Sequence, residues 1–182
     1  MIRKLKRGVQ AQICVILAVT VLAGSGDVEK VGDRLQVALP VAGLVCAIAN
    51  GDAASYMLRF IGTNAAVHGL KRGLGDADIN RRPSGSLQGF PSGHTAAAAF
   101  GASYLVHQCV QRNKALQGVA VFSAAYVGAS RIEAGKHFLF QVMFGALLGW
   151  LGERGVVMLC SLRASLRRLG VLRRVYLRSL RS

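Results

Sequence analysis

The chain has 182 residues, of which 52% are hydrophobic and only 17% are charged. That length fits one domain, and the composition is too apolar for an ordinary soluble domain of this size. The formal net charge is +15, but four basic residues fall in residues 1–7 and seven arginines in residues 161–182. Charge at the two ends suits anionic lipid headgroups better than nucleic acid, which needs a basic surface on a folded domain. The sequence therefore predicts a membrane protein without a nucleic-acid partner.

Six apolar segments follow one another along the chain. The first, residues 9–24, comes after a basic flank and is either a cleavable signal peptide or a retained helix. A consistent topology favours the helix, because it gives an even number of crossings. The other segments are residues 35–49, 53–70, 94–110, 115–129 and 138–160. We predict an all-α fold, a polytopic transmembrane bundle of about six helices formed by one domain, residues 1–160.

The basic segments predict the orientation of this bundle. Residues 161–182 place leucines along one stripe between arginines, which predicts an amphipathic cytoplasmic tail at the membrane surface. A cytoplasmic N-terminus also puts the basic turn 111–114 inside, as the positive-inside rule requires. The loops 25–34, 71–93 and 130–137 then lie outside. We expect a multi-pass protein of a bacterial-type inner membrane, with its active site at the extracytoplasmic mouth.

Several polar or reactive residues inside the apolar segments carry no chemical signal of their own. The four cysteines have no short spacing typical of a metal site or a disulfide framework, so we predict buried thiols: Cys14, Cys46, Cys109 and Cys160. Arg59 is predicted to extend from its helix to the cytoplasmic membrane surface. His68 and His107 are predicted to be packing residues. No cofactor is expected, and the sequence leaves the oligomeric state open.

The groups suited to chemistry lie in two of the outer loops. Phosphoryl transfer needs cations and amide donors around the phosphate oxygens, a nucleophile and an acid for the leaving oxygen. Lys71, Arg82 and Arg131 supply positive charge, and arginine can hold two phosphate oxygens at once. The run Pro91-Ser92-Gly93-His94 opens a helix, whose free amides and serine hydroxyl form an anion site. His94 can protonate the leaving oxygen, and His137 can attack phosphorus.

Three motifs in these loops resemble those of the type 2 phosphatidic acid phosphatase superfamily, in the same order. They are Arg82-Pro83, Pro91-Ser92-Gly93-His94 and Ser130-Arg131-x5-His137. The resemblance implies a membrane lipid phosphatase that works through a phosphohistidine intermediate and needs no metal. It implies His137 as nucleophile and His94 as general acid. The implied phosphate-binding residues are Lys71, Arg82, Ser92, Gly93 and Arg131.

The chain departs from the family pattern at two positions. Lys71 lies eleven residues before Arg82, whereas the family spaces this pair by seven. Gln141 stands where the family has an aspartate, four residues after the nucleophilic histidine. The amide of Gln141 can orient the imidazole but brings no charge. Glu133 is the nearest carboxylate that can replace the aspartate, so either residue is a candidate partner of His137.

These observations leave three functions open. The first is hydrolysis of a lipid phosphate monoester or diphosphate, with an isoprenoid diphosphate, phosphatidylglycerol phosphate, phosphatidate or lipid A phosphate as substrate. The second is transfer of the phosphate to another lipid at the same site. The third is a lipid-phosphate-binding pseudoenzyme, because a charge lost beside a catalytic histidine can severely reduce turnover. Membrane lipids are the expected partners in each case.

Overall fold

The computed structural model describes residues 8–10, 12–13, 15 and 27–155, and every regular element in that part of the chain is helical. The helices are α2 (Val28–Asn50), α3 (Ala53–Gly73), η1 (Asp78–Asn80), α4 (Gly93–Tyr104), the π-helical η2 (Leu105–Cys109) and α5 (Lys114–Glu133). A further helix begins at residue 139 and is described as far as residue 155. The tail 161–182 lies outside the described residues, as does most of the segment 9–24. The all-α prediction is confirmed for the described part.

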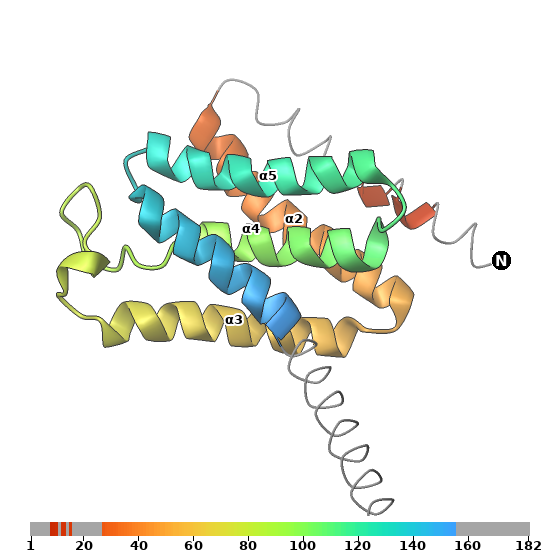
Figure 1. Ribbon diagram of the computed structural model, residues 1–182, viewed down its shortest axis with the longest axis horizontal. Coiled ribbons are helices and arrows are strands. Elements are labelled where there is room, and N and C mark those ends of the chain that lie inside the picture. Colours follow the sequence, from red (N-terminus) through yellow and green to blue (C-terminus); the bar gives the residue numbers. More distant parts are fainter. Residues whose placement is uncertain (1–7, 11, 14, 16–26, 156–182) are drawn as a thin grey trace, which may run out of the picture.

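Helix α4 lies at the centre of the bundle, between α3 and α5, with α2 crossing behind it and the helix 139–155 crossing in front (Figure 1). Small residues permit these crossings. A Cβ atom at Gly101 would lie 2.5 Å from the backbone of Leu39 and Pro40 in α2. A Cβ atom at Gly149 would overlap the carbonyl oxygen of Ala96. Because α4 is held on both sides at backbone distance, the residues at its N-terminus have a fixed position.

An aromatic cluster fills the space between α3 and α4. The ring of Tyr56 meets the rings of Phe100 and Tyr104 edge to face, with centroids 5.2 and 4.7 Å apart. Its hydroxyl donates a hydrogen bond of 2.7 Å to the carbonyl of Pro40 in α2. Edge-to-face pairs of this kind add to the stabilisation gained from burying the rings. The cluster therefore ties α3 to the central helix and to α2.

Helix α2 begins earlier than the sequence predicted, and the loop expected at residues 25–34 is largely helical. The side chain of Asp27 caps the helix by accepting from the amides of Glu29 and Lys30, at 3.0 and 3.2 Å. An aspartate followed by a glutamate in the first turn is a typical helix start, and this signal was present in the sequence. Within the described residues, α2 is the one helix that is long and apolar enough to cross a membrane.

Cys46 and Cys109 form a disulfide, so the prediction of free thiols is wrong for this pair. They lie 63 residues apart in the sequence, at the C-terminal ends of α2 and η2, with Cα atoms separated by 6.2 Å. So long a separation leaves no local spacing signal for sequence reasoning to use. Cys14 and Cys160 lie outside the described residues. The side chain of Gln10 donates to the carbonyl of Cys109.

The side chain of Arg59 reaches Asp52 in the turn between α2 and α3, and its extension to the membrane surface stays a prediction. Arg59 is only 11% exposed and forms ion pairs with Asp52 and Glu153, at 3.1 and 3.2 Å. Glu153 is fully buried and accepts a second bond of 2.6 Å from the hydroxyl of Ser103. His107, expected to be a packing residue, lies beside this network, 4.0 Å from Glu153. The network joins α3, α4 and the helix 139–155 at one end of the bundle.

The contact at Gly101 yields a stability prediction. Gly101→Ala places a methyl group against the backbone of α2, which cannot move as a side chain can, and should cost about 1–3 kcal/mol of unfolding free energy. Gly118→Ala in α5 is the matched control, because a Cβ atom there meets no atom within 4 Å. Alanine favours helix over glycine, so the control should be neutral or stabilising by up to about 1 kcal/mol. Thermal unfolding in detergent compares them, and equal midpoints would contradict the packing.

Candidate active site

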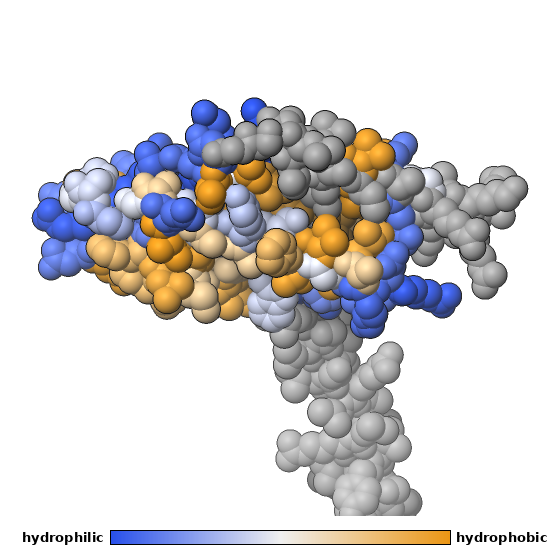
Figure 2. Space-filling view, turned by 90° about the horizontal axis from the view of Figure 1, so that it is seen from above, coloured by the Kyte–Doolittle hydropathy of each residue, from blue (hydrophilic) through white to orange (hydrophobic). Residues whose placement is uncertain are grey.

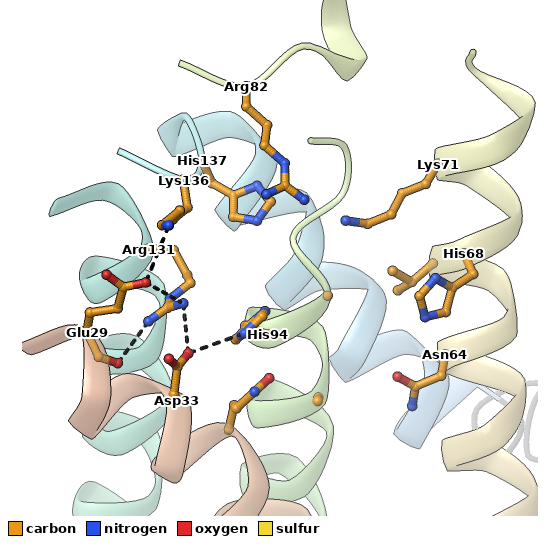
Figure 3. A pocket seen from close by; sticks show the side chains of 14 residues that line it. Glu29, Asp33, Asn64, His68, Lys71, Arg82, His94, Arg131, Lys136 and His137 are labelled. Carbon is orange, nitrogen blue, oxygen red and sulfur yellow. Dashed lines mark hydrogen bonds and ion pairs between the residues drawn. The ribbon is translucent and has the colours of Figure 1, made fainter. Parts of the chain in front are cut away.

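A pocket of about 500 Å³ lies at the end of the bundle formed by the first turn of α2, the last turns of α3 and α5, and the start of α4 (Figure 3). Six of the eight predicted site residues line it: Lys71, Arg82, Gly93, His94, Arg131 and His137. The other two, Ser92 and Gln141, are fully buried and do not line the pocket. The fold thus brings together residues that are spread over 67 positions of the sequence, from 71 to 137.

His137 is held by Gln141, as the sequence allowed. The ring Nδ1 of His137 lies 3.2 Å from Oε1 of Gln141. The amide nitrogen of Gln141 faces two carbonyl oxygens, of Ile79 at 3.1 Å and Arg81 at 2.7 Å, so the side-chain oxygen must face the histidine. An acceptor at Nδ1 places the ring proton there and leaves a lone pair on Nε2. Nε2 is therefore the ring atom that is free to act as a nucleophile.

Glu133, the other candidate partner of His137, is exposed at the end of α5. Within the part of the chain that the structure describes, neither a hydrogen bond nor an ion pair joins it to His137. The geometry favours Gln141 over Glu133 as the residue in the place of the family aspartate.

The environment of His137 keeps the ring neutral. Burial is the largest cause that lowers its pKa, and the positive charges of Lys71 and Arg82 lower it further. The hydrogen bond to Gln141 acts in the opposite direction, and the resulting pKa is about 4. A neutral imidazole has the lone pair that a nucleophile needs. The pKa of Lys71, which lies beyond the predicted span 53–70, is lowered to about 8, first by burial and then by Arg82.

Three cations surround the pocket in a manner suited to a phosphate group. Lys71 is 8% exposed and donates to the carbonyl of Gln88 at 2.8 Å, despite its long spacing from Arg82. Arg82 has a buried Nε atom without a hydrogen-bond partner among the described residues. A buried unpaired donor of this kind is costly unless a ligand satisfies it. Oxygen atoms of a bound phosphate would do so, and Arg131 supplies a third charge from the last turn of α5.

The N-terminus of α4 supplies amide donors on the same side of the pocket. Ser92 caps this helix, and its hydroxyl oxygen accepts from the amide and the hydroxyl of Thr95. The amides of Gly93 and His94 belong to the first turn, where a helix has no internal partners for its N–H groups. Gly93 and His94 therefore can contact a phosphate. A direct contact from Ser92 remains a prediction.

Sequence reasoning missed two acidic residues of the pocket, Glu29 and Asp33. The carboxylate of Asp33 lies 2.8 Å from Arg131 and 3.3 Å from Nε2 of His94 (Figure 3). The carbonyl of Glu29 accepts from Arg131 at 3.0 Å, and its carboxylate lies 3.7 Å from Lys136. These residues were assigned to an outer loop. Recognition of Asp27 as a helix cap would have placed both on one face of α2, because they are four residues apart.

Comparison with known proteins tests the family resemblance of the chain. The model of the PAP2 superfamily matches residues 14–163. The chain belongs to this superfamily. It is 30% identical over 138 residues to a lipid A 4'-phosphatase of Helicobacter pylori (strain J99), a match that covers 70% of this chain and 68% of that protein. No solved structure matches the chain. The resemblance drawn from the three motifs is therefore confirmed at the level of the family.

Gln141 gives the first prediction for this site. Gln141→Asp restores the family residue but removes both donors to the loop carbonyls, and Gln141→Glu removes them without shortening the side chain. Each should destabilise the loop 79–89 by about 1–3 kcal/mol in all, since two hydrogen bonds worth about 0.5–1.5 kcal/mol each are lost. Faster amide hydrogen exchange in this loop and lower turnover are the expected results.

A matched control comes from the other end of the bundle. The amide nitrogen of Gln117 also donates to two backbone carbonyls, of Val110 and Gln111. Gln117→Glu should therefore leave hydrogen exchange in the loop 79–89 unchanged. Higher turnover of Gln141→Asp with unchanged exchange would show that the amide has no such role.

The pKa of His137 gives a second prediction. In an NMR titration of the ring nitrogens, His137 should take up its proton near pH 4, well below the ordinary 6.5. Lys71→Met removes a charge that lowers this pKa, so the midpoint should rise. It should stay below 6.5, because burial is the larger cause. A wild-type midpoint near 6.5 would contradict the buried, neutral nucleophile.

Proposed function

We propose that the protein is an integral membrane enzyme that hydrolyses a lipid phosphate through a phosphohistidine intermediate, with His137 as nucleophile and His94 as general acid. The observation that carries this proposal is the orientation of His137, whose Nδ1 is held by Gln141 while the ring lines a pocket with three cations. Membership of the PAP2 superfamily and the lipid phosphatase relative support the same kind of function.

The proposed reaction has two steps. Nε2 of His137 attacks phosphorus, the bond from phosphorus to the lipid oxygen breaks, and His94 gives its proton to that oxygen. Water then attacks the phosphohistidine, His94 takes a proton from the water, and the phosphorus–nitrogen bond breaks to release phosphate. Lys71, Arg82 and Arg131 stabilise the negative charge on the phosphate oxygens in both steps. Because side chains supply this charge, the proposal assigns no role to a metal ion.

A lipid A-type glycolipid phosphate is the substrate that we propose first. The relative named as a lipid A 4'-phosphatase supports it. So do Gln36 and Asn64, two polar side chains that line the pocket beyond the phosphate-binding residues. Asn64 lies seven residues before Lys71 on α3, which is about 10 Å along the helix. Side-chain amides inside the pocket can hydrogen-bond to the hydroxyl groups of a sugar, whereas a hydrocarbon chain would leave them without partners.

The outer surface of the bundle supports placement in a membrane. The face seen in Figure 2 is apolar along its middle and hydrophilic at its two ends. Large apolar side chains point outward from several helices, including Val37, Val41, Leu58, Ile61, Phe122, Met143, Leu147 and Leu151. An exposed apolar surface of this extent is unusual for a soluble monomer. We propose a multi-pass bundle in a bacterial-type inner membrane, with residues 161–182 as a cytoplasmic tail.

The pocket lies at the end that this topology places outside the cytoplasm. The disulfide Cys46–Cys109 lies near the opposite end, and cytoplasmic thiols are normally kept reduced. This topology makes that end cytoplasmic, so a pair found oxidised in cells would oppose the proposed orientation and a pair found reduced would support it.

One observation favours a second candidate, the lipid-phosphate-binding pseudoenzyme. Gln141 fixes the ring of His137 but brings no negative charge to stabilise the cation formed by attack on phosphorus. Loss of a carboxylate in this position reduces turnover by roughly 10⁴-fold in the serine-protease triad. Transfer to an acceptor lipid in place of water stays an alternative outcome of the same chemistry.

The experiment is phosphate release by purified protein in detergent, with a chelator present. The panel contains a lipid A-type glycolipid phosphate, phosphatidate, phosphatidylglycerol phosphate and an isoprenoid diphosphate. We expect release from the glycolipid phosphate, and His137→Ala should lower it by roughly 10³-fold or more. An acid-labile phosphoprotein should form from labelled substrate and should be absent from this variant.

The control is His107→Ala, which removes a histidine from the other end of the bundle and should retain release. Release that persists in His137→Ala, or that depends on added metal, would overturn the mechanism. Binding of the lipids without any release would establish the pseudoenzyme. Consumption of labelled substrate that depends on an acceptor lipid would indicate the transferase.

A further inference from the structure

Asp33 belongs to none of the three motifs, yet its carboxylate joins two of them. One oxygen atom, Oδ1, lies 3.3 Å from Nε2 of His94 in the second motif and 2.8 Å from the guanidinium of Arg131 in the third (Figure 3). Arg131 is only 4% exposed in its side chain and so is firmly placed. The shared oxygen therefore sets the position of His94 relative to a fixed phosphate-binding cation.

The two histidines of the pocket have partners of different charge. Nδ1 of His137 faces a neutral amide, whereas Nε2 of His94 faces a carboxylate. A carboxylate pairs with a protonated imidazole and favours that form over the neutral ring. A neutral partner does not. Nδ1 of His94 has no hydrogen-bond partner among the described residues, so in the protonated ring this second N–H is free to donate.

From this arrangement we propose that Asp33 is a positioning residue for the general acid. In the protonated ring it holds Nε2–H of His94 and so leaves Nδ1–H to protonate the departing lipid oxygen. The inference rests on the proposed function, because it concerns the acid of the same reaction. It assigns to α2 a direct part in the site that the three motifs do not include.

The neighbouring carboxylate of Glu29 does not have this role. It contacts Arg131 and Lys136, at 3.9 and 3.7 Å, and no ion pair joins it to His94 within the described residues. Glu29 and Asp33 stand on the same helix and line the same pocket. A change at Glu29 therefore removes a carboxylate from the pocket without removing the partner of the acid.

The test is Asp33→Asn, compared with Glu29→Gln. Asparagine keeps the size of the side chain and an oxygen for Arg131 but removes the charge. Two substrates separate the roles: an alkyl lipid phosphate, whose leaving oxygen needs a proton, and 4-nitrophenyl phosphate, whose leaving oxygen hardly needs one. General acids contribute roughly 10²–10⁴-fold to such reactions. We expect Asp33→Asn to lower kcat/KM for the alkyl ester by roughly 10- to 100-fold and to change the aryl ester by less than about threefold.

The pH profile supplies a second readout. The proton on His94 must be present for the alkyl ester, so the alkaline limb of kcat/KM should move to lower pH in Asp33→Asn. The other charged or titratable groups that face the pocket are Glu29 from α2, His68 and Lys71 from α3, Arg131 from α5, and Arg82, Lys136 and His137 from the loops. Glu29→Gln should leave the alkaline limb and the ratio of the two substrates at their wild-type values.

Each outcome is decisive. Equal losses on both substrates in Asp33→Asn would assign the residue to phosphate binding or to folding and would overturn the proposal. Unchanged values on both would overturn it as well. If Glu29→Gln changed the kcat/KM ratio of the two substrates as much as Asp33→Asn does, loss of any negative charge from the pocket would explain the effect. Asp33 would then not be a specific partner of His94. Failure of the wild-type protein to release phosphate from either substrate would overturn the proposed function itself, and is recognised without any variant.

Discussion

The buried side-chain amide of Gln141 is the constraint on which the site depends. Its two hydrogens are taken by carbonyls of Ile79 and Arg81, and its oxygen accepts from His137 and from the amide of Phe138. Every hydrogen-bonding group of the side chain is therefore used, as burial requires. One residue thus ties the loop that carries Arg82 to His137. A carboxylate cannot do this, because it has no hydrogen to give to a carbonyl.

With Gln141 in place of the family aspartate, this chain has its negative charge beside His94 and not beside His137. His137 has a neutral partner, and one of the two carboxylates of the pocket, that of Asp33, lies against the other histidine. The two imidazoles need opposite protonation states for the proposed reaction. The carboxylate beside His94 favours the protonated form of that ring, whereas the neutral amide beside His137 brings no charge that does so. The missing aspartate beside His137 is therefore consistent with catalysis and does not by itself indicate its loss.

The sequence predicted what depends on local pattern and on motifs. Hydropathy gave the helical segments, and the three motifs gave five of the residues that line the pocket, to which the basic residue Lys71 was added. It did not predict what depends on tertiary contact. Cys46 and Cys109 meet only because α2 and η2 end at the same place, and Arg59 finds Glu153 across 94 residues. Asp33 was missed for a different reason. Residues 25–34 were assigned to a loop because Asp27 was not recognised as the cap of helix α2.

The two ends of the bundle both contain arginines with little exposure, and a physical difference between them indicates which end binds a ligand. At one end, Arg59 is matched by Asp52 and Glu153, and Glu153 in turn is satisfied by Ser103. That network is closed, so it stabilises the fold without a further partner. At the other end, the lining of the pocket holds four basic and two acidic residues, and the Nε atom of Arg82 is buried without a partner among the described residues. An excess of positive charge with a buried unused donor suits an anion, and a phosphate group would supply both the charge and the acceptor atoms.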